Sequence, residues 1–253
     1  MQELLGISRI DLLSRPGEAV SLEERHKLTE AIKRRSQQEP LQYIIGSATF
    51  YGRDFMVDPA VLIPRPETEL LVEWALSNLV DTEGARVLDL GTGSGCIPIS
   101  IALENSGSMC FGADVSEDAL EVARKNARSL APSVSMLNAD ILSRSSLQQL
   151  PGPFNILVSN PPYIAENERP SIESQVKDFE PDIALFAGED PLHFYRAIVN
   201  HAPLLLVPGG QVGVEIHSDH GPEVETLFVR AGFNSVEVLQ DLAGKNRVVT
   251  ARI

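Results

Sequence analysis

From Arg86 to the end of the chain, short apolar runs alternate with stretches of helical periodicity, and this alternation restricts the possible fold more than any other feature. Strands separated by helices imply a mostly parallel sheet covered by helices on both faces. The expected strands are 87–90, 109–114, 134–138, 154–160, 210–216, 234–240 and 247–253. The expected helices lie near 95–104, 117–130, 144–150, 191–206 and 220–231. No helix separates the last two strands, so the last of these seven strands is expected to be antiparallel.

The residues that precede this alternation carry other patterns. Residues 3–14 have helical spacing, and the sequence SLEE from Ser21 to Glu24 is a capping box that should begin a helix ending near Gln38. Residues 42–58 alternate apolar and polar side chains around two glycines, which predicts a β-hairpin. The expected organisation is a short helical domain over 1–41, a hairpin linker over 42–58 and an α/β domain over 59–253.

Composition narrows the class of protein. Hydrophobic residues make up 43% of the 253 positions and charged residues 22%, as in ordinary globular proteins. No apolar run approaches the roughly 18 residues of a membrane-spanning helix, and the N-terminus does not resemble a signal peptide. Two cysteines, Cys96 and Cys110, cannot form a disulfide framework, so a cytoplasmic location is expected. A net charge of −14 makes nucleic acid an unlikely main partner.

A glycine-rich segment follows the first expected strand of the sheet and begins a helix. Glycine lets the backbone turn sharply and approach a ligand, and the helix N-terminus offers free N–H groups to an anion. The spacing is G-x-G-x-G, and Cys96 stands where the dinucleotide fingerprint has its last glycine. A tight turn without a ligand is the simpler alternative. The cofactor-binding candidates here are Asp89, Gly91, Thr92, Gly93, Ser94 and Gly95, and Asn160 of the later SNPPY segment is a further one.

Acids stand at the ends of the next two strands. Asp114 is placed to accept hydrogen bonds from both ribose hydroxyls of a nucleoside, although it can instead cap the helix beginning near Ser116. Asp140 and Ile141 suit the amino group and the ring face of adenine, and a surface acid at a strand end is the alternative interpretation. Together with the glycine segment, these residues predict a nucleoside-containing cofactor.

The combined motifs resemble a known family. VLDLGTGSG (87–95), Asp114, Asp140 and SNPPY (159–163) are similar to class I S-adenosylmethionine-dependent methyltransferases with a Rossmann-like sheet. The surrounding segments narrow the resemblance to the peptide-chain release factor glutamine methyltransferases, the PrmC/HemK family. Those segments are EPLQYIIG (39–46), LIPRPETE (62–69), EP-x-x-AL (180–185) and DLAGKNRVV (241–249). The resemblance extends from about residue 39 to 253.

This resemblance implies an enzyme that transfers a methyl group from S-adenosylmethionine to the side-chain amide of glutamine. The glutamine would belong to the Gly-Gly-Gln loop of class-one release factors, the partners that the resemblance implies. In the family, the helical domain and the hairpin hold the release factor, and the helical domain is short in this chain. A monomer is expected, and no metal is required for methyl transfer from a sulfonium.

The NPPY sequence suits this reaction because an amide nitrogen is a poor nucleophile that needs orientation. The side-chain oxygen of Asn160 and the carbonyl of Pro161 can accept both N–H bonds of a substrate amide and hold its nitrogen in line with the methyl donor. Pro161 and Pro162 stiffen the loop, and the ring of Tyr163 can pack on the planar amide. No base is identified for the departing proton, so water is the expected acceptor. A rigid turn without chemistry is the alternative.

Weaker candidates lie elsewhere in the chain. Arg65 and Glu67 either line the substrate cleft or are a solvated arginine and a helix-start acid. The histidines at 217 and 220 stand among acids, but a surface loop is the expected explanation rather than a metal site. Cys96 is expected to be a small buried residue rather than a nucleophile.

Two other functions compete with glutamine methylation. Adenine N6-methylation of nucleic acid uses the same NPPY chemistry on a flipped base, but the acidic composition and the IPRPETE segment argue against it. A non-catalytic binding protein on the same fold is the second alternative, since a fold does not establish an activity. Retention of both the glycine segment and NPPY argues against that alternative.

Overall fold

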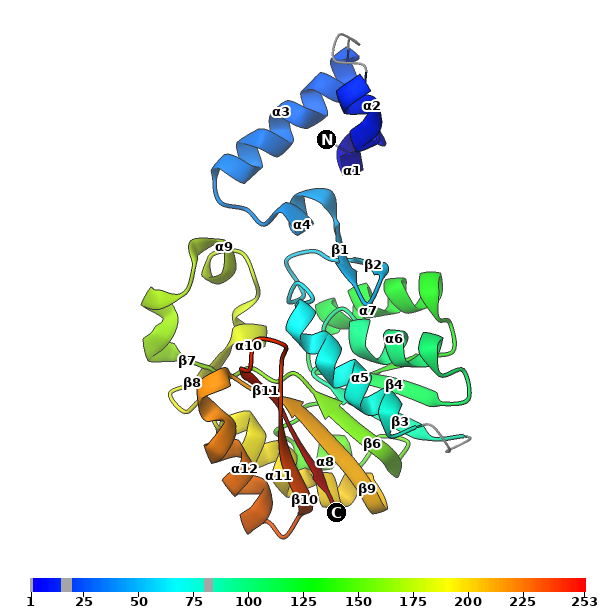
Figure 1. Cartoon of the computed structure of the whole chain (residues 1–253), viewed down its shortest axis with the longest axis vertical. Helices are drawn as coiled ribbons and strands as arrows, with labels where there is room; N and C mark the ends of the chain where they lie inside the picture. The colour runs from blue at the N-terminus through cyan, green and yellow to red at the C-terminus, as the bar shows by residue number, and fades with distance from the viewer. Residues whose placement is uncertain (1, 15–19, 80–83) are drawn as a thin grey trace.

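The computed structural model describes residues 2–14, 20–79 and 84–253, and its centre is a seven-stranded sheet (Figure 1). The strands are β3 (Arg86–Leu90), β4 (Met109–Asp114), β5 (Ser135–Asn138), β6 (Phe154–Ser159), β9 (Leu206–Glu215), β10 (Asn234–Gln240) and β11 (Asn246–Arg252). Their order across the sheet is β10-β11-β9-β6-β3-β4-β5. β11 is antiparallel to both of its neighbours, β10 and β9. The pairings among β3, β4, β5, β6 and β9 are parallel. The predicted seven-stranded, mostly parallel sheet is therefore confirmed.

Helices cover both faces of this sheet. One layer contains α5 (Glu69–Ser77), α6 (Cys96–Glu104) and α7 (Glu117–Leu130). The other contains α8 (Arg144–Leu147), α11 (His193–Leu205) and α12 (Gly221–Arg230). Consecutive residues of β3 serve opposite layers, since Val87 packs in the first core and Leu88 in the second. Burial on both faces explains why the central strands, such as β3 and β6, are mainly apolar in the sequence.

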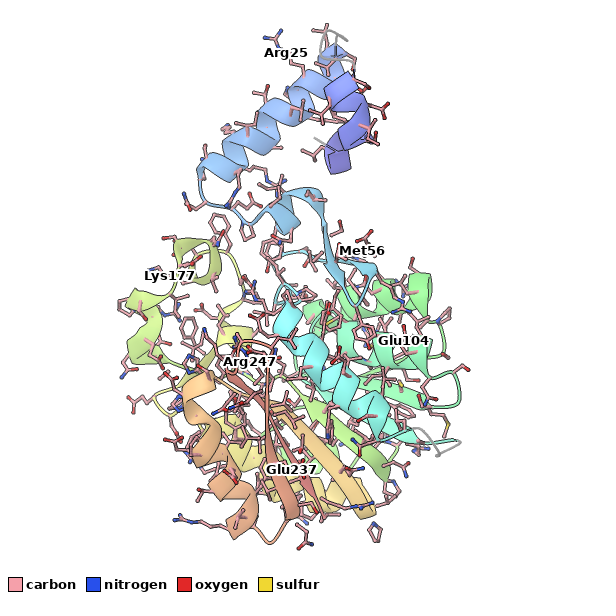
Figure 2. The ribbon with its side chains drawn as sticks, viewed as in Figure 1. Arg25, Met56, Glu104, Lys177, Glu237 and Arg247 are labelled. Carbon is pink, nitrogen blue, oxygen red and sulfur yellow. The ribbon has the colours of Figure 1, made fainter. Side chains whose placement is uncertain are left out.

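The N-terminal helices project away from the sheet. They are α1 (Gln2–Leu5), α2 (Arg9–Ser14) and α3 (Leu22–Ser36). The capping box at the start of α3 is confirmed, because Ser21 and Glu24 each accept the other's backbone N–H. The single helix predicted over 3–14 is wrong, since Gly6 has a φ of 64° and ends α1. No residue of α3 is buried, and Figure 2 shows its Arg25 well separated from Glu237 at the far end of the molecule.

The hairpin is confirmed, but it begins later than predicted. Residues Leu41–Ile45 form the short helix α4, which ends at Gly46 in the left-handed conformation. The hairpin consists of β1 (Ser47–Phe50) and β2 (Arg53–Met56). A five-residue apolar stretch fits helical and strand periodicity equally well, and burial of Tyr43 and Ile44 against the following segments selects the helix. The domain boundaries drawn from the sequence stay a prediction.

A small subdomain separates the NPPY residues from α11. It contains β7 (Ile164–Ala165), α9 (Ser174–Lys177), α10 (Asp182–Leu185) and β8 (Phe186–Gly188), with β7 and β8 paired in parallel. Its Gln175 accepts hydrogen bonds from Arg35 of α3 at 3.4 Å. The described residues also contain the 3₁₀ turns η1 (Pro66–Thr68), η2 (Glu166–Ser171) and η3 (Ser218–His220). Across the residues that are described, no helix is long and apolar enough to cross a membrane.

Candidate active site

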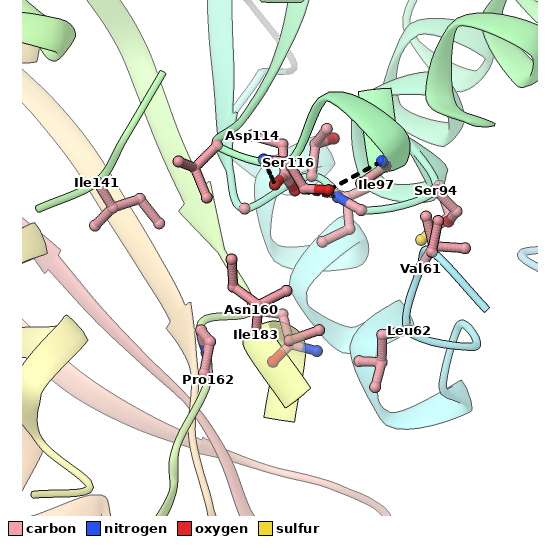
Figure 3. A pocket seen from close by; sticks show the side chains of 18 of the residues that line it. Val61, Leu62, Ser94, Ile97, Asp114, Ser116, Ile141, Asn160, Pro162 and Ile183 are labelled. Atoms are coloured by element: carbon pink, nitrogen blue, oxygen red, sulfur yellow. Dashed lines mark hydrogen bonds between the residues drawn. The ribbon is translucent and has the colours of Figure 1, made fainter. Parts of the chain in front are cut away.

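A cavity of about 340 Å³ opens at the carboxyl ends of β3 and β6 (Figure 3). The chain leaves β3 toward β4 on one side and, later, β6 toward β9 on the other. The cavity therefore lies at the point where the strand order reverses, and open α/β sheets bind their ligands at such points. The glycine segment that follows β3 and the NPPY residues that follow β6 meet here, although nearly 70 residues separate them in the sequence.

The glycine segment adopts a backbone that needs glycine. Gly91, Gly93 and Gly95 have φ values of 75°, 53° and 80°, in the left-handed region. Gly95 is also the N-cap of α6, and a Cβ atom there would lie 2.9 Å from the Cε atom of Met136. The turn directs the chain from the end of β3 into the first turn of α6 beside the cavity.

We expect Gly95→Ala to lower the free energy of unfolding by about 1–3 kcal/mol, because a left-handed alanine is strained. The contact with Met136 should add to that cost. The matched control is Gly232→Ala, since Gly232 has a φ of 86° but a Cβ atom there would meet no atom within 4 Å. Urea unfolding of both variants measures the difference. An equal or smaller loss in Gly95→Ala would show that the tight packing around the loop contributes nothing.

Asp114 organises the glycine segment from the next strand. Its Oδ2 accepts the N–H of Gly93 and its Oδ1 accepts the N–H of Ser116, each at 2.9 Å. Burial raises the pKa of this carboxyl group, which these backbone hydrogen bonds oppose. The suggested capping role belongs to Ser116, whose side chain accepts the N–H of Ala119. Asp114 lines the cavity, and Figure 3 shows it beside Ser116 at one end of the site.

Asp140 and Ile141 follow β5 and line the cavity beside the glycine segment, since a Cβ atom at Gly91 would lie 3.6 Å from the Cδ1 atom of Ile141. The Oδ1 atom of Asp140 accepts the N–H of Leu142 at 2.8 Å, and its own N–H donates to Ser146 at 3.1 Å. Both residues line the cavity together with Leu142, so this end of the site combines an acid with two apolar side chains.

Asp89 differs from the other acids because it is completely buried under the glycine segment and does not line the cavity. Neither carboxylate oxygen has a hydrogen-bond partner among the described residues. Burial is the main reason that the pKa of Asp89 rises to about 7. Asp89 therefore lies beneath the glycine segment and outside the lining of the cavity.

Asn160 joins the main cavity to a second one of about 310 Å³. The side-chain N–H of Asn160 donates to the hydroxyl of Thr68 at 3.3 Å. Ser159, the preceding residue, donates to the carbonyl of Leu90 at 2.6 Å and so fastens the end of β6 to the end of β3. The residues shared by the two cavities are Leu62, Arg65, Asn160 and Ala184.

The remaining NPPY residues divide between the cavities and the core. Pro162 lines the main cavity and Tyr163 the second, whereas Pro161 is buried and its side chain lines neither. Burial raises the pKa of Tyr163, and its ring centroid lies 6.1 Å from that of His217.

Arg65 is held in place rather than solvated. It forms an ion pair with Glu180 at 2.5 Å, and the Glu180 carboxylate also accepts the N–H of Ile63 at 3.1 Å. The side chain of Glu180 is only 1% exposed, so this pair fastens the IPRPETE loop to the small subdomain. Glu67 lines neither cavity and lies 3.6 Å from Arg247.

The structure thus brings most of the sequence candidates to one place. Those that line the main cavity are Arg65, Gly91, Thr92, Gly93, Ser94, Asp114, Asp140, Ile141, Asn160 and Pro162. Tyr163 lines the second cavity, and Asp89, Gly95, Pro161 and Glu67 line neither. Cys96 is buried at the cavity wall, where burial raises its pKa to about 12. Within the described parts of the chain, no cluster of three potential metal ligands is found.

Sequence reasoning missed several supporting residues. Asn126 of α7 is 2% exposed, and its amide binds both backbone groups of Met56 and the carbonyl of Ser94 in the glycine segment. Thr68 and Glu180 stand inside segments that carry the resemblance, IPRPETE and EP-x-x-AL, and that position was the available signal. Asn126 lies within an ordinary amphipathic helix, and no pattern distinguishes it.

Comparison with known sequences assigns two family models to the chain. The PrmC N-terminal domain matches residues 1–46, and the methyltransferase small domain matches residues 67–176. A release factor glutamine methyltransferase of Chlorobaculum tepidum is 42% identical over 245 residues, which cover 94% of this chain and 83% of the relative. The protein of the same name from Neisseria gonorrhoeae is 39% identical over 252 residues, which cover 100% of this chain and 90% of the relative.

Solved structures agree on the fold. A methyltransferase from Pyrococcus furiosus superimposes with a TM-score of 0.58 at 15% identity, covering 91% of this chain and 98% of that one. At that identity, the likeness concerns the arrangement of strands and helices.

Proposed function

We infer from its membership of the release factor glutamine methyltransferases, the family to which this chain belongs, that the protein methylates the glutamine of the Gly-Gly-Gln loop in class-one release factors. The methyl donor is S-adenosylmethionine, and the protein acts in the cytoplasm, as a monomer on a protein substrate. The observation that carries this proposal is the position of Asn160 at the junction of two cavities, one suited to the cofactor and one suited to the acceptor.

The main cavity fits S-adenosylmethionine in its chemistry. Asp114 offers a carboxylate to the ribose hydroxyls, and the apolar side chains of Ile141 and Leu142 flank a space suited to the adenine ring, with Asp140 placed for its amino group. The left-handed glycines keep side-chain atoms away from the cavity where Gly91 and Gly93 line it.

The second cavity fits a glutamine side chain that enters from the surface. Leu62, Ile164 and Ile172 supply apolar walls for its methylene groups, and Tyr163 supplies an aromatic one. Arg65, which is fastened by Glu180, lines both cavities and so bounds the passage between them. A glutamine amide that reaches the junction meets Asn160.

At the junction, the protein orients the amide rather than activating it by deprotonation. When bound, S-adenosylmethionine supplies a methyl group on an electrophilic sulfonium. The Oδ1 atom of Asn160 and the carbonyl of Pro161 accept the two N–H bonds of the glutamine amide, which directs its nitrogen toward the main cavity. The same two acceptors stabilise positive charge as it develops on that nitrogen. Water takes the proton once the new N–C bond has formed.

Methyl transfer from labelled S-adenosylmethionine to an unmodified release factor tests the proposal. Peptide mass spectrometry should place the label on the glutamine of the Gly-Gly-Gln loop. A release factor in which that glutamine is replaced by glutamate is the control and should take up no label. Label on another residue, or none with the cofactor bound, would overturn the substrate assignment. Adenine-containing DNA and RNA, offered in parallel, then identify nucleic acid as the acceptor if they are labelled instead.

A further inference from the structure

A buried carboxylate lies behind the candidate active site and has no part in the reaction described so far. Glu215 is the last residue of β9, and 3% of it is exposed. Its Oε2 atom has no hydrogen-bond partner among the described residues. A buried, incompletely paired carboxylate is costly for the fold, so its presence next to a reaction site needs an explanation.

Strand register brings Glu215 to the base of NPPY. β6 and β9 are parallel neighbours, and Ser159 is paired with Val214. The next residues along the two strands are Asn160 and Glu215, so the two side chains belong to adjacent positions at the same edge of the sheet.

Thr68 lies between these two side chains. It is 3% exposed and ends the η1 turn, which enters the site from a distant part of the chain. Its hydroxyl accepts the side-chain N–H of Asn160 at 3.3 Å, and the same hydroxyl is near enough to Glu215 to lower the pKa of that carboxyl group. The Thr68 hydroxyl therefore lies between the side chains of Asn160 and Glu215.

The order of donors and acceptors from Asn160 through Thr68 to Glu215 has a direction. An ionised carboxylate only accepts, so any hydrogen bond between Thr68 and Glu215 is donated by the Thr68 hydroxyl, which keeps its lone pairs for Asn160. Asn160 then directs its NH₂ group at Thr68, which leaves its Oδ1 atom free for the substrate amide. An asparagine with the opposite orientation would present N–H donors to the N–H bonds of the substrate amide and repel it.

We propose that Glu215 and Thr68 are positioning residues. They fix which end of the Asn160 side-chain amide, the oxygen or the NH₂ group, meets the substrate. This proposal rests on the proposed function, because it assigns Asn160 the task of holding an acceptor amide. Neither Glu215 nor Thr68 touches the reacting atoms. Their effect is to disfavour the alternative orientation of Asn160, so that its oxygen faces the substrate as long as Glu215 is ionised.

The charge environment of Glu215 sets the pH range in which this arrangement holds. Burial is the largest influence and raises its pKa to about 7, while Thr68 and two arginines oppose the rise. The charged and titratable groups that face it are Glu67, Arg65, Arg247, Tyr163, Tyr195 and Cys96. As the pH falls through this value, Glu215 takes up a proton and becomes able to donate to Thr68. The hydroxyl hydrogen of Thr68 is then free to point at Asn160, and the Asn160 amide loses its preferred orientation.

Steady-state kinetics with release factor and S-adenosylmethionine test the proposal in Glu215→Gln, Thr68→Val, the double variant and Thr68→Ser. Glu215→Gln and Thr68→Val should each lower kcat by about 10- to 100-fold, because the amide is misoriented in part of the molecules. The KM for S-adenosylmethionine should stay unchanged. The double variant should be no slower than the slower single variant, since both substitutions interrupt the same series of contacts from Glu215 through Thr68 to Asn160. Thr68→Ser keeps the hydroxyl and should retain most of the rate.

The controls separate positioning from packing. Thr250→Val replaces another buried threonine, on β11, that lines neither cavity and should not change kcat. In the wild type, kcat should fall as the pH drops below about 7, and Thr68→Val should lose that part of the pH profile. If Glu215→Gln does not fold, Thr68→Val against Thr68→Ser carries the test alone. Additive losses, or wild-type turnover in Thr68→Val, would overturn the positioning role, whereas no methylation by the wild-type protein would overturn the proposed function.

Discussion

Replacing Asn160 with alanine is expected to lower the rate of methyl transfer to release factor by about 1,000-fold, because a preorganised acceptor at the reacting nitrogen is lost. The truncated side chain removes the oxygen that we assign to the substrate amide and leaves the Thr68 hydroxyl without its donor. The affinity for S-adenosylmethionine should change little, because the acids and glycines that line the rest of the main cavity stay in place.

Single-turnover kinetics with saturating cofactor measure this rate, and equilibrium binding measures the affinity. Asn200→Ala, on the exposed surface of α11, is the matched control and should behave as the wild type. A rate within a few fold of the wild type would remove Asn160 from the reaction. A parallel loss of cofactor affinity would instead assign Asn160 to the cofactor.

Asp114→Ala is expected to weaken S-adenosylmethionine binding by about 100-fold, as two charge-assisted hydrogen bonds to the ribose are lost. The change also releases the N–H groups of Gly93 and Ser116, which the carboxylate holds at 2.9 Å. Calorimetric titration with the cofactor measures the dissociation constant.

Asp118→Ala, in the exposed first turn of α7, removes an acid close by in sequence and should leave cofactor affinity as it is. Asp114→Asn should fall between the two, because its amide can accept from only one of the backbone N–H groups. Unchanged binding by Asp114→Ala would mean that the cofactor lies elsewhere in the cavity.

The sheet was predictable because its central strands, such as β3 and β6, are buried on both faces. Residues such as Val87, Leu88 and Leu90 belong to short, mainly apolar runs, and the helices between these runs have clear periodicity, so the number of strands and the helical layers follow from the sequence. The glycine segment was predictable for a related reason, since its left-handed backbone admits few other residues. The same local logic predicted the capping box at the start of α3.

Contacts between distant segments were not predictable in this way. Arg65 and Glu180 are 115 residues apart, and Asn160 and Thr68 are 92 residues apart. No local pattern in the sequence indicates that these pairs are in contact. Asp89 is an example of a motif residue that lies elsewhere than its motif indicates. The motif indicates a contact with the cofactor, whereas the side chain is buried in the interior. Short elements such as α4 and α9 also escaped prediction, because tertiary contacts rather than propensity decide such brief stretches.

The amide of Asn126 gives the hairpin and the glycine segment a shared dependence. It satisfies both backbone groups of Met56 and the carbonyl of Ser94, so moving either segment alone leaves a buried polar group unpaired, at a cost of about 1–3 kcal/mol. Whatever docks against the hairpin and whatever fills the main cavity therefore alter each other's affinity through the same side chain. Thermodynamic linkage makes that influence reciprocal, so cofactor occupancy and protein docking should be heterotropically coupled.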